Sequence, residues 1–282
     1  PPPHGKLRAV GEKQFPILQK GRVAPPWRGC GSPCENRTRR ELPETNLEET
    51  WRMTKDAGQM IDRIMSNPDS CDDGILVNDL LREFHRGYPI EKLRPLMLSD
   101  NEKVAKVGIW VASELGGKAA PLLDDLTKLL HHPERYVRYF AIDSLLTCAT
   151  REKEAAIAAV VSMLDDTDGA VRWKALDFLS RASAEQLEAG LSCLSKTEPD
   201  SLHLVGLRRL LGGDAGSPNE ALSLLGSDSS TLRKYGVVAA VRMAEVTQEP
   251  LAVASSIDDE DVSGFAKDAL KRIIRRTDRA QP

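Results

Sequence analysis

A pattern that returns about every 30 residues constrains this chain more than any other feature of its sequence. Within residues 133–146, Val137, Ala141 and Leu145 place an apolar, a small and a second apolar residue four positions apart, on one stripe of a helix. The successive copies are spaced by 33, 34, 31, 30 and 30 residues, which is typical of repeat proteins whose neighbouring units bury each other's apolar faces. The other five copies begin at Val104, Val171, Leu202, Leu232 and Val262.

A shorter apolar segment precedes each copy, which predicts two helices per repeat. The turns between the two helices are rich in Asp, Asn, Pro and Gly, which form turns and cap helix N-termini. Residues 54–66 and 74–84 are helical in pattern but lack the template, so we expect an atypical pair that caps the array. The sequence thus predicts an all-α superhelix of about seven helix pairs over residues 53–276 and a C-terminal tail at 277–282. The predicted first helices cover residues 93–98, 122–130, 155–164, 187–194, 221–225 and 251–257.

Residues 1–52 differ from the rest of the chain. They hold several Pro and Gly residues and a basic cluster at 37–40, and they show no helical or strand periodicity. This composition predicts disorder. We hypothesise that translation starts at Met53, because Glu48 and Glu49 can be encoded by a purine-rich run like a bacterial ribosome-binding site, so that this segment lies outside the native protein.

The cysteines, histidines and apolar runs indicate a reducing cytoplasm and no cofactor. The five cysteines form an odd, scattered set without a secretory signal, and Cys148 and Cys193 are expected to be buried, inert thiols. The longest apolar run, residues 155–164, is shorter than the roughly 20 residues of a membrane span, so we expect no membrane partner. His131 and His132 lie at a predicted turn without further metal ligands, which favours helix capping. No nucleotide-binding, serine hydrolase or zinc protease motif is present, and no metal, cofactor or catalytic residue is predicted.

The two-helix unit, with Val-Arg opening its second helix at Val137-Arg138 and Val171-Arg172 and Leu-Arg at Leu232-Arg233, resembles HEAT repeats, particularly the short bacterial kind. Phycobilisome lyase-type proteins are similar in the repeat alone. The resemblance covers residues 54–276 and implies a right-handed superhelix whose second helices line the concave side. The usual Arg is missing at three second helices, so a continuous row of Asp and Arg ion pairs is not expected; these positions are Ala105, His203 and Ser263.

The second helices also present aromatic residues at positions expected to face solvent. Positions two and six after the start of each stripe lie opposite its centre at 100° per residue. Trp110, Tyr139 and Trp173 fall at these positions in three neighbouring repeats and are predicted partner-binding anchors. Burial between adjacent helices is the alternative for these rings. The remaining solvent candidates are Lys106, Leu204, Lys234, Gly264, Asp143, Asp177, Arg208, Val238 and Asp268.

Charge is distributed unevenly between the two kinds of helix, although the formal net charge is only -3. The last four second helices are net basic and the first helices are net acidic, which predicts a groove that attracts an acidic partner. The basic residues expected to contact acidic groups of that partner are Arg172, Arg208, Arg209, Arg233 and Lys234.

These features favour a non-enzymatic, protein-binding scaffold or adaptor, of which an immunity-type inhibitor wrapping a toxin is a more specific form. Nucleic-acid binding is the alternative, with the same basic residues on phosphates and the aromatic rings on bases. Tyr139 with Asp143, and Trp173 with Asp177, are similar to the aromatic groove and Asp of HEAT-like alkylpurine DNA glycosylases, but only in these two pairs. The paired His-Glu steps of HEAT-repeat di-iron hydroxylases are absent. Oligomeric state is not predicted.

Overall fold

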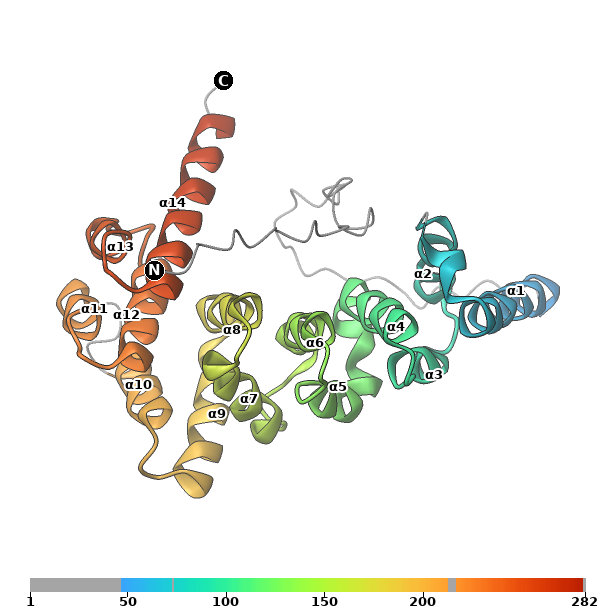
Figure 1. Ribbon diagram of the computed structural model, residues 1–282, viewed down its shortest axis with the longest axis horizontal. Helices are drawn as coiled ribbons and strands as arrows, with labels where there is room; N and C mark the ends of the chain where they lie inside the picture. Colours follow the sequence, from blue (N-terminus) through green and yellow to red (C-terminus); the bar gives the residue numbers. More distant parts are fainter. Residues whose placement is uncertain (1–46, 73, 213–216, 281–282) are drawn as a thin grey trace, which may run out of the picture. The chain divides into compact units, whose positions relative to one another are not determined.

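The computed structural model describes residues 47–72, 74–212 and 217–280, and the chain divides into two compact units at Tyr88 and Pro89 (Figure 1). The described residues contain α-helices and short 3-10 helices and no strand. Fourteen α-helices follow one another along these residues, which confirms the predicted all-α array of about seven helix pairs.

The first unit contains a single helix pair, α1 (Leu47–Ser66) and α2 (Ile75–Arg86), joined by the 3-10 helix η2 (Pro68–Cys71). Apolar residues of both helices are buried, including Ile64 of α1 and Phe84 of α2. Helix α1 begins six residues before the predicted boundary at Met53, so residues 47–52 are helical and not irregular. The rest of the predicted disordered segment, residues 1–46, lies outside the described residues.

The second unit contains six further helix pairs, and residues 277–280 of its last helix replace most of the predicted tail. Figure 1 shows α4, α6 and α8 in one row and α3, α5 and α7 in a second row. The α-helices of this unit are α3 (Arg94–Met97), α4 (Glu102–Glu114), α5 (Leu123–Leu129), α6 (Arg135–Cys148), α7 (Glu154–Ser162), α8 (Gly169–Arg181), α9 (Ala184–Thr197), α10 (Leu202–Leu211), α11 (Pro218–Leu225), α12 (Ser230–Arg242), α13 (Glu249–Ala254) and α14 (Glu260–Ala280), and its 3-10 helices are η3 (Ile90–Leu93), η4 (Gly116–Leu122) and η5 (Met163–Asp165).

Polar residues in the turns start the second helices, as the sequence predicts. Asn101 accepts hydrogen bonds from the backbone N–H groups of the first turn of α4, and Asp168 does the same for α8. The N-cap of α6 is Glu134, whose side chain accepts a hydrogen bond from the backbone N–H of Tyr136. His132 Nδ1 accepts one from the backbone N–H of Glu134 at 3.1 Å, so it holds the turn before α6 but does not itself cap the helix. These caps define where each second helix begins and therefore which of its residues face the core.

In the regular part of the array, α6 packs between α4 and α8. Each of these second helices also packs on the first helix of its own pair, which is α3, α5 or α7. The small residue in the middle of each stripe permits this close approach. At Gly108, an added Cβ atom would lie 2.4 Å from the backbone N of Met97 and 2.6 Å from the backbone C of Leu96, so α4 lies directly against the backbone of α3.

We expect Gly108→Ala to lower the free energy of unfolding by about 2 kcal/mol, because backbone atoms cannot move aside as a flexible side chain can. Gly264→Ala in α14 is the matched control, since no atom lies within 4 Å of its added Cβ. That control should stabilise the protein by about 0.5 kcal/mol through the better helix propensity of Ala. Urea unfolding followed by circular dichroism measures both, and equal effects would contradict this close packing of α3 and α4.

The array changes at α10, where the predicted stripe of Leu202, Gly206 and Leu210 is only partly buried. After α6, it is α12 and not α10 that packs on α8, and α14 packs on both α8 and α12. Leu202, the predicted start of the buried stripe, is 46% exposed, whereas Leu204 is buried. Gly206 and Leu210 are buried as predicted, and the ring of Tyr235 from α12 packs directly on Gly206.

Several positions predicted to face solvent are therefore buried instead. Helix α12 contacts α8, α10, α11, α13 and α14, so both sides of it are covered. The prediction assumed one buried side per second helix, which holds only where the repeats stack in a single row. The buried positions are Asp177, Leu204, Lys234 and Val238.

Candidate functional site

The three predicted aromatic anchors lie on consecutive helices of the regular row. Trp110 belongs to α4, Tyr139 to α6 and Trp173 to α8, and all three are half-buried. We call the surface of α4, α6 and α8 around these rings the aromatic face. Half-buried rings on helices that pack together are held in place and still present an apolar edge to a ligand.

Trp173 is covered by the chain's own C-terminal helix. Its ring packs edge-on against Phe265 of α14, with centroids 5.6 Å apart, and the guanidinium carbon of Arg272 lies 5.8 Å from its centroid. Asp177, one turn along α8, is buried and accepts hydrogen bonds from Arg181 at 3.2 Å and Arg272 at 3.4 Å. Trp173 thus belongs mainly to the contact between α8 and α14.

Tyr139 contacts one further aromatic ring and one cation of the same chain. Its ring packs edge-on against Phe140 at 5.3 Å, and Lys174 Nζ lies 4.8 Å from its centroid. The same Nζ donates to Asp143 Oδ1 at 2.6 Å. Burial raises the pKa of the Tyr139 hydroxyl, and the nearby Lys174 opposes that rise.

Trp110 differs from the other two rings in its contacts. In the part of the chain that the structure describes, no aromatic ring packs on it and no cation lies over it. Glu114, one turn further along α4, is exposed and has no hydrogen bond or ion pair with any described residue. Partial burial, and next the negative charge of Asp143, raises the pKa of the Glu114 carboxyl.

The Arg residues that open the second helices form contacts within the chain. Arg138 binds both carboxylate oxygens of Asp166, at 2.7 and 2.8 Å, and donates to the carbonyls of His132 and Pro133. Arg172 and Arg233 bind the two carbonyls of their preceding turns in the same way. Each of these guanidinium groups therefore fixes the turn before its own helix to a carboxylate elsewhere in the array.

The carboxylate partner of Arg172 shows where the row of repeats is interrupted. Arg233 pairs with Asp259 in the next turn along the chain, at 2.9 Å. Arg172 instead binds Asp261 of α14, at 2.6 and 3.0 Å, because α14 and α12 occupy the side of α8 that the next repeat would cover. We call the pairs of Arg138, Arg172 and Arg233 with their Asp partners the Asp–Arg ladder. Arg172 and Arg233, predicted to contact a partner, belong to this ladder.

The remaining predicted basic residues differ in exposure. Lys234 is 5% exposed, and its Nζ donates to the carbonyl of Leu164 at 2.5 Å and lies 3.5 Å from Asp165. Arg209 pairs with Glu220. Arg208 is exposed and has no hydrogen bond or ion pair among the described residues.

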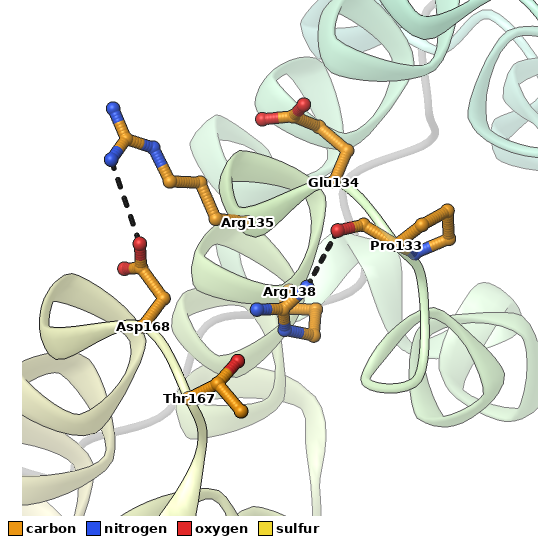
Figure 2. A pocket seen from close by; sticks show the side chains of 6 residues that line it. All are labelled: Pro133, Glu134, Arg135, Arg138, Thr167 and Asp168. Atoms are coloured by element: carbon orange, nitrogen blue, oxygen red, sulfur yellow. Dashed lines mark hydrogen bonds and ion pairs between the residues drawn. The ribbon is translucent and has the colours of Figure 1, made fainter.

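An open polar hollow lies between the starts of α6 and α8 and has a volume of about 350 Å³ (Figure 2). Arg135 Nη1 lies 3.5 Å from Asp168, and Arg138 donates to the carbonyl of Pro133 at 2.9 Å. The charged groups of this hollow therefore belong to the Asp–Arg ladder, through Arg138, and to the N-cap of α8, through Asp168. The lining residues are Pro133, Glu134, Arg135, Arg138, Thr167 and Asp168.

Sequence reasoning missed three residues that shape the aromatic face: Glu114, Phe265 and Arg272. Glu114 carried a readable signal, since it follows Trp110 by four positions, as Asp143 follows Tyr139 and Asp177 follows Trp173. Phe265 and Arg272 carried none, because their contacts depend on the return of α14 to α8.

The possible metal ligands, the thiols and the length of the helices can be described for residues 47–72, 74–212 and 217–280. No group of three His, Cys, Asp or Glu side chains among them is arranged to hold a metal ion. Cys148 and Cys193 are free and buried, as predicted, and burial raises the pKa of the Cys148 thiol. The described helices include none that is both long and apolar enough to cross a membrane.

Comparison with protein-family models supports the repeat assignment. A family model described as HEAT repeats matches residues 123–202. A designed armadillo repeat protein in complex with the peptide (KR)4 is similar at a TM-score of 0.42 and 19% identity, over 76% of this chain and 97% of that one. A computationally designed armadillo repeat protein for modular peptide recognition is similar at 0.37 and 16%, over 80% and 94%. None of the curated proteins matches this chain.

Proposed function

Because residues 123–202 are HEAT repeats within an all-α array, we propose that this protein is a non-enzymatic scaffold or adaptor that binds another protein through its aromatic face. The observation that carries this proposal is that Trp110 and Tyr139 are half-buried on adjacent, packed helices, and that among the described residues no ring or cation lies over Trp110. Large rigid rings bury much area on binding at a small cost in side-chain entropy. Inhibition of a toxin, as in an immunity-type protein, is a more specific form of the same proposal.

Most of the basic residues predicted to bind a partner already pair with carboxylates of the same chain. The proposal therefore depends on aromatic contacts more than on charge. Arg172, Arg209, Arg233 and Lys234 all have carboxylate partners within the chain, so their charge is largely compensated before a partner arrives. Arg208 is the member of this set that is exposed and unpaired among the described residues. An acidic partner would have to use Arg208 and the exposed cations of α14.

Nucleic-acid binding is a second candidate, and a row of exposed cations on α14 favours it. Lys267, Lys271 and Arg275 are four residues apart on one side of that helix and are exposed. A protein that binds phosphates through such a row loses affinity steeply as salt rises. The glycosylase reading gains no such support, since Asp143 and Asp177 both lie in ion pairs.

The scaffold proposal is tested by affinity capture with the full chain, with and without nuclease. We expect Trp110→Ala/Tyr139→Ala to lose the captured partner while keeping its helical spectrum and melting temperature. Leu202→Ala/Val205→Ala removes two exposed apolar residues of α10 and is the matched control, which should retain the partner. Trp173 is left unchanged because its loss would disturb the packing of α14.

The captured protein is then identified by mass spectrometry and purified, and its affinity for the same variants is measured at low and high salt. Retention of the partner by Trp110→Ala/Tyr139→Ala would move the binding site away from the aromatic face. Nuclease-sensitive capture with a steep salt dependence would transfer the function to nucleic-acid binding.

A further inference from the structure

Three consecutive second helices carry the same arrangement of an aromatic residue and a carboxylate. The carboxylate follows the ring by four positions, so both lie on one side of the helix, one turn apart. We call these three units the aromatic–carboxylate pairs. They are Trp110 with Glu114 on α4, Tyr139 with Asp143 on α6, and Trp173 with Asp177 on α8.

In two of the three pairs, a cation of the same chain contacts both members. On α6, Lys174 Nζ lies 4.8 Å from the Tyr139 centroid and 2.6 Å from Asp143 Oδ1. On α8, the Arg272 guanidinium carbon lies 5.8 Å from the Trp173 centroid, and its Nη1 lies 3.4 Å from Asp177 Oδ1. A ring face and a carboxylate attract the same cation, so each pair acts as a small cation-binding unit.

The pair on α4 has no such cation among the described residues. Glu114 forms no ion pair there, and no charged group lies over the Trp110 ring. The nearest basic residue on the same helix, Lys106, is engaged with Glu102 and with Glu134 at 3.5 Å. Burial, and next the negative charge of Asp143, raises the pKa of the Glu114 carboxyl, and no described cation pairs with it to oppose that rise.

We propose that Trp110 and Glu114 bind an Arg side chain of the partner protein, in the way that Trp173 and Asp177 bind Arg272. This inference deepens the proposed scaffold function and rests on it. A planar guanidinium can stack on the indole and donate two hydrogen bonds to one carboxylate, which an ammonium group cannot do. At this end of the aromatic face, charge complementarity therefore favours a basic segment, in contrast to the acidic partner that the sequence predicted.

The test uses the ¹⁵N-labelled full chain and two capped Gly-Ser-Xaa-Ser-Gly peptides, in which Xaa is Arg or its neutral analogue citrulline. The indole N–H signal of Trp110 is assigned by its loss in Trp110→Phe. We expect the Arg peptide to shift this signal with a dissociation constant at least about fivefold lower than that of the citrulline peptide. Glu114→Gln should abolish most of that preference, whereas Glu188→Gln, at an exposed position of α9, should leave it unchanged.

Equal shifts with both peptides would overturn the inference, as would an unchanged Arg preference in Glu114→Gln with an otherwise native spectrum. The outcome can be separated from that of the scaffold proposal. Failure of the peptides together with partner capture that depends on Trp110 and Tyr139 rejects the Arg site alone. Arg-selective binding without any captured protein supports the cation site and rejects the scaffold function.

Discussion

Ala141→Asp is expected to lower the free energy of unfolding of the repeat unit by about 4 kcal/mol, because it places an unpaired carboxylate in the interior. Ala141 is fully buried in the middle of α6, between Val137 and Leu145 on the same stripe. Helix α6 packs on α4, α5 and α8, so its buried stripe lies within the packed interior of the repeats. The surrounding stripe offers apolar side chains, which cannot pair with the new carboxylate.

Ala155→Asp is the matched control for this substitution, because Ala155 is exposed in the first turn of α7, where a negative charge suits the helix dipole. Its effect should lie within about 0.5 kcal/mol of zero. Urea unfolding of both variants, followed by circular dichroism, measures the difference. Native-like stability of Ala141→Asp would show that the buried stripe of α6 is assigned incorrectly.

Lys234→Ala is expected to lower the free energy of unfolding by about 3 kcal/mol, although sequence analysis places Lys234 among the partner-binding residues. Its ammonium group donates to the buried end of η5 at the carbonyl of Leu164 and lies 3.7 Å from Asp261. Removing it leaves that carbonyl without this hydrogen bond and creates space between α12 and α8. Asp261 keeps its bidentate contact with Arg172, which limits the loss.

Arg208→Ala is the control for Lys234→Ala, since Arg208 is a predicted binding residue that is exposed. It should change stability by less than about 0.5 kcal/mol. Thermal and urea unfolding distinguish the two roles, because a partner-binding residue can be removed without cost to the free protein. A Lys234→Ala variant that melts like the wild type but loses the captured partner would restore Lys234 to the binding surface.

Much of the local structure could be read from the sequence because it depends on neighbours within one or two turns. Val137, Ala141 and Leu145 form a buried stripe through the helical period alone, and Asn101 and Asp168 cap helices through their own backbone contacts. Helix α1 begins seven residues before its predicted start at residue 54, because the residues before that position carry no repeat pattern to mark it.

The candidate site was predictable only where the repeats stack in a single row. Trp110 and Tyr139, predicted to face solvent, are half-buried on α4 and α6, and their role as partner anchors stays a prediction. Trp173 lies on the same face, but Phe265 and Arg272 of α14 cover it. The spacing of Glu114 from Trp110 was visible in the sequence, whereas its lack of a cation became apparent only after Lys174 and Arg272 were located.

The sequence by itself determined the helix pairs, the capped turns and the buried stripes, since a period of 3.6 residues and a repeat of about 30 require only local geometry and contact between adjacent units. Only the tertiary structure decided that α12 and α14 pack on α8. This packing also decides which charged side chains have a partner within the chain. In a straight row of repeats, the surface would include Lys234, Arg172 and Asp177. In the structure, all three form contacts where α8, α12 and α14 pack together. The reason is physical: ion pairs between residues 89 or 95 positions apart depend on how helices pack in space, which no local period records.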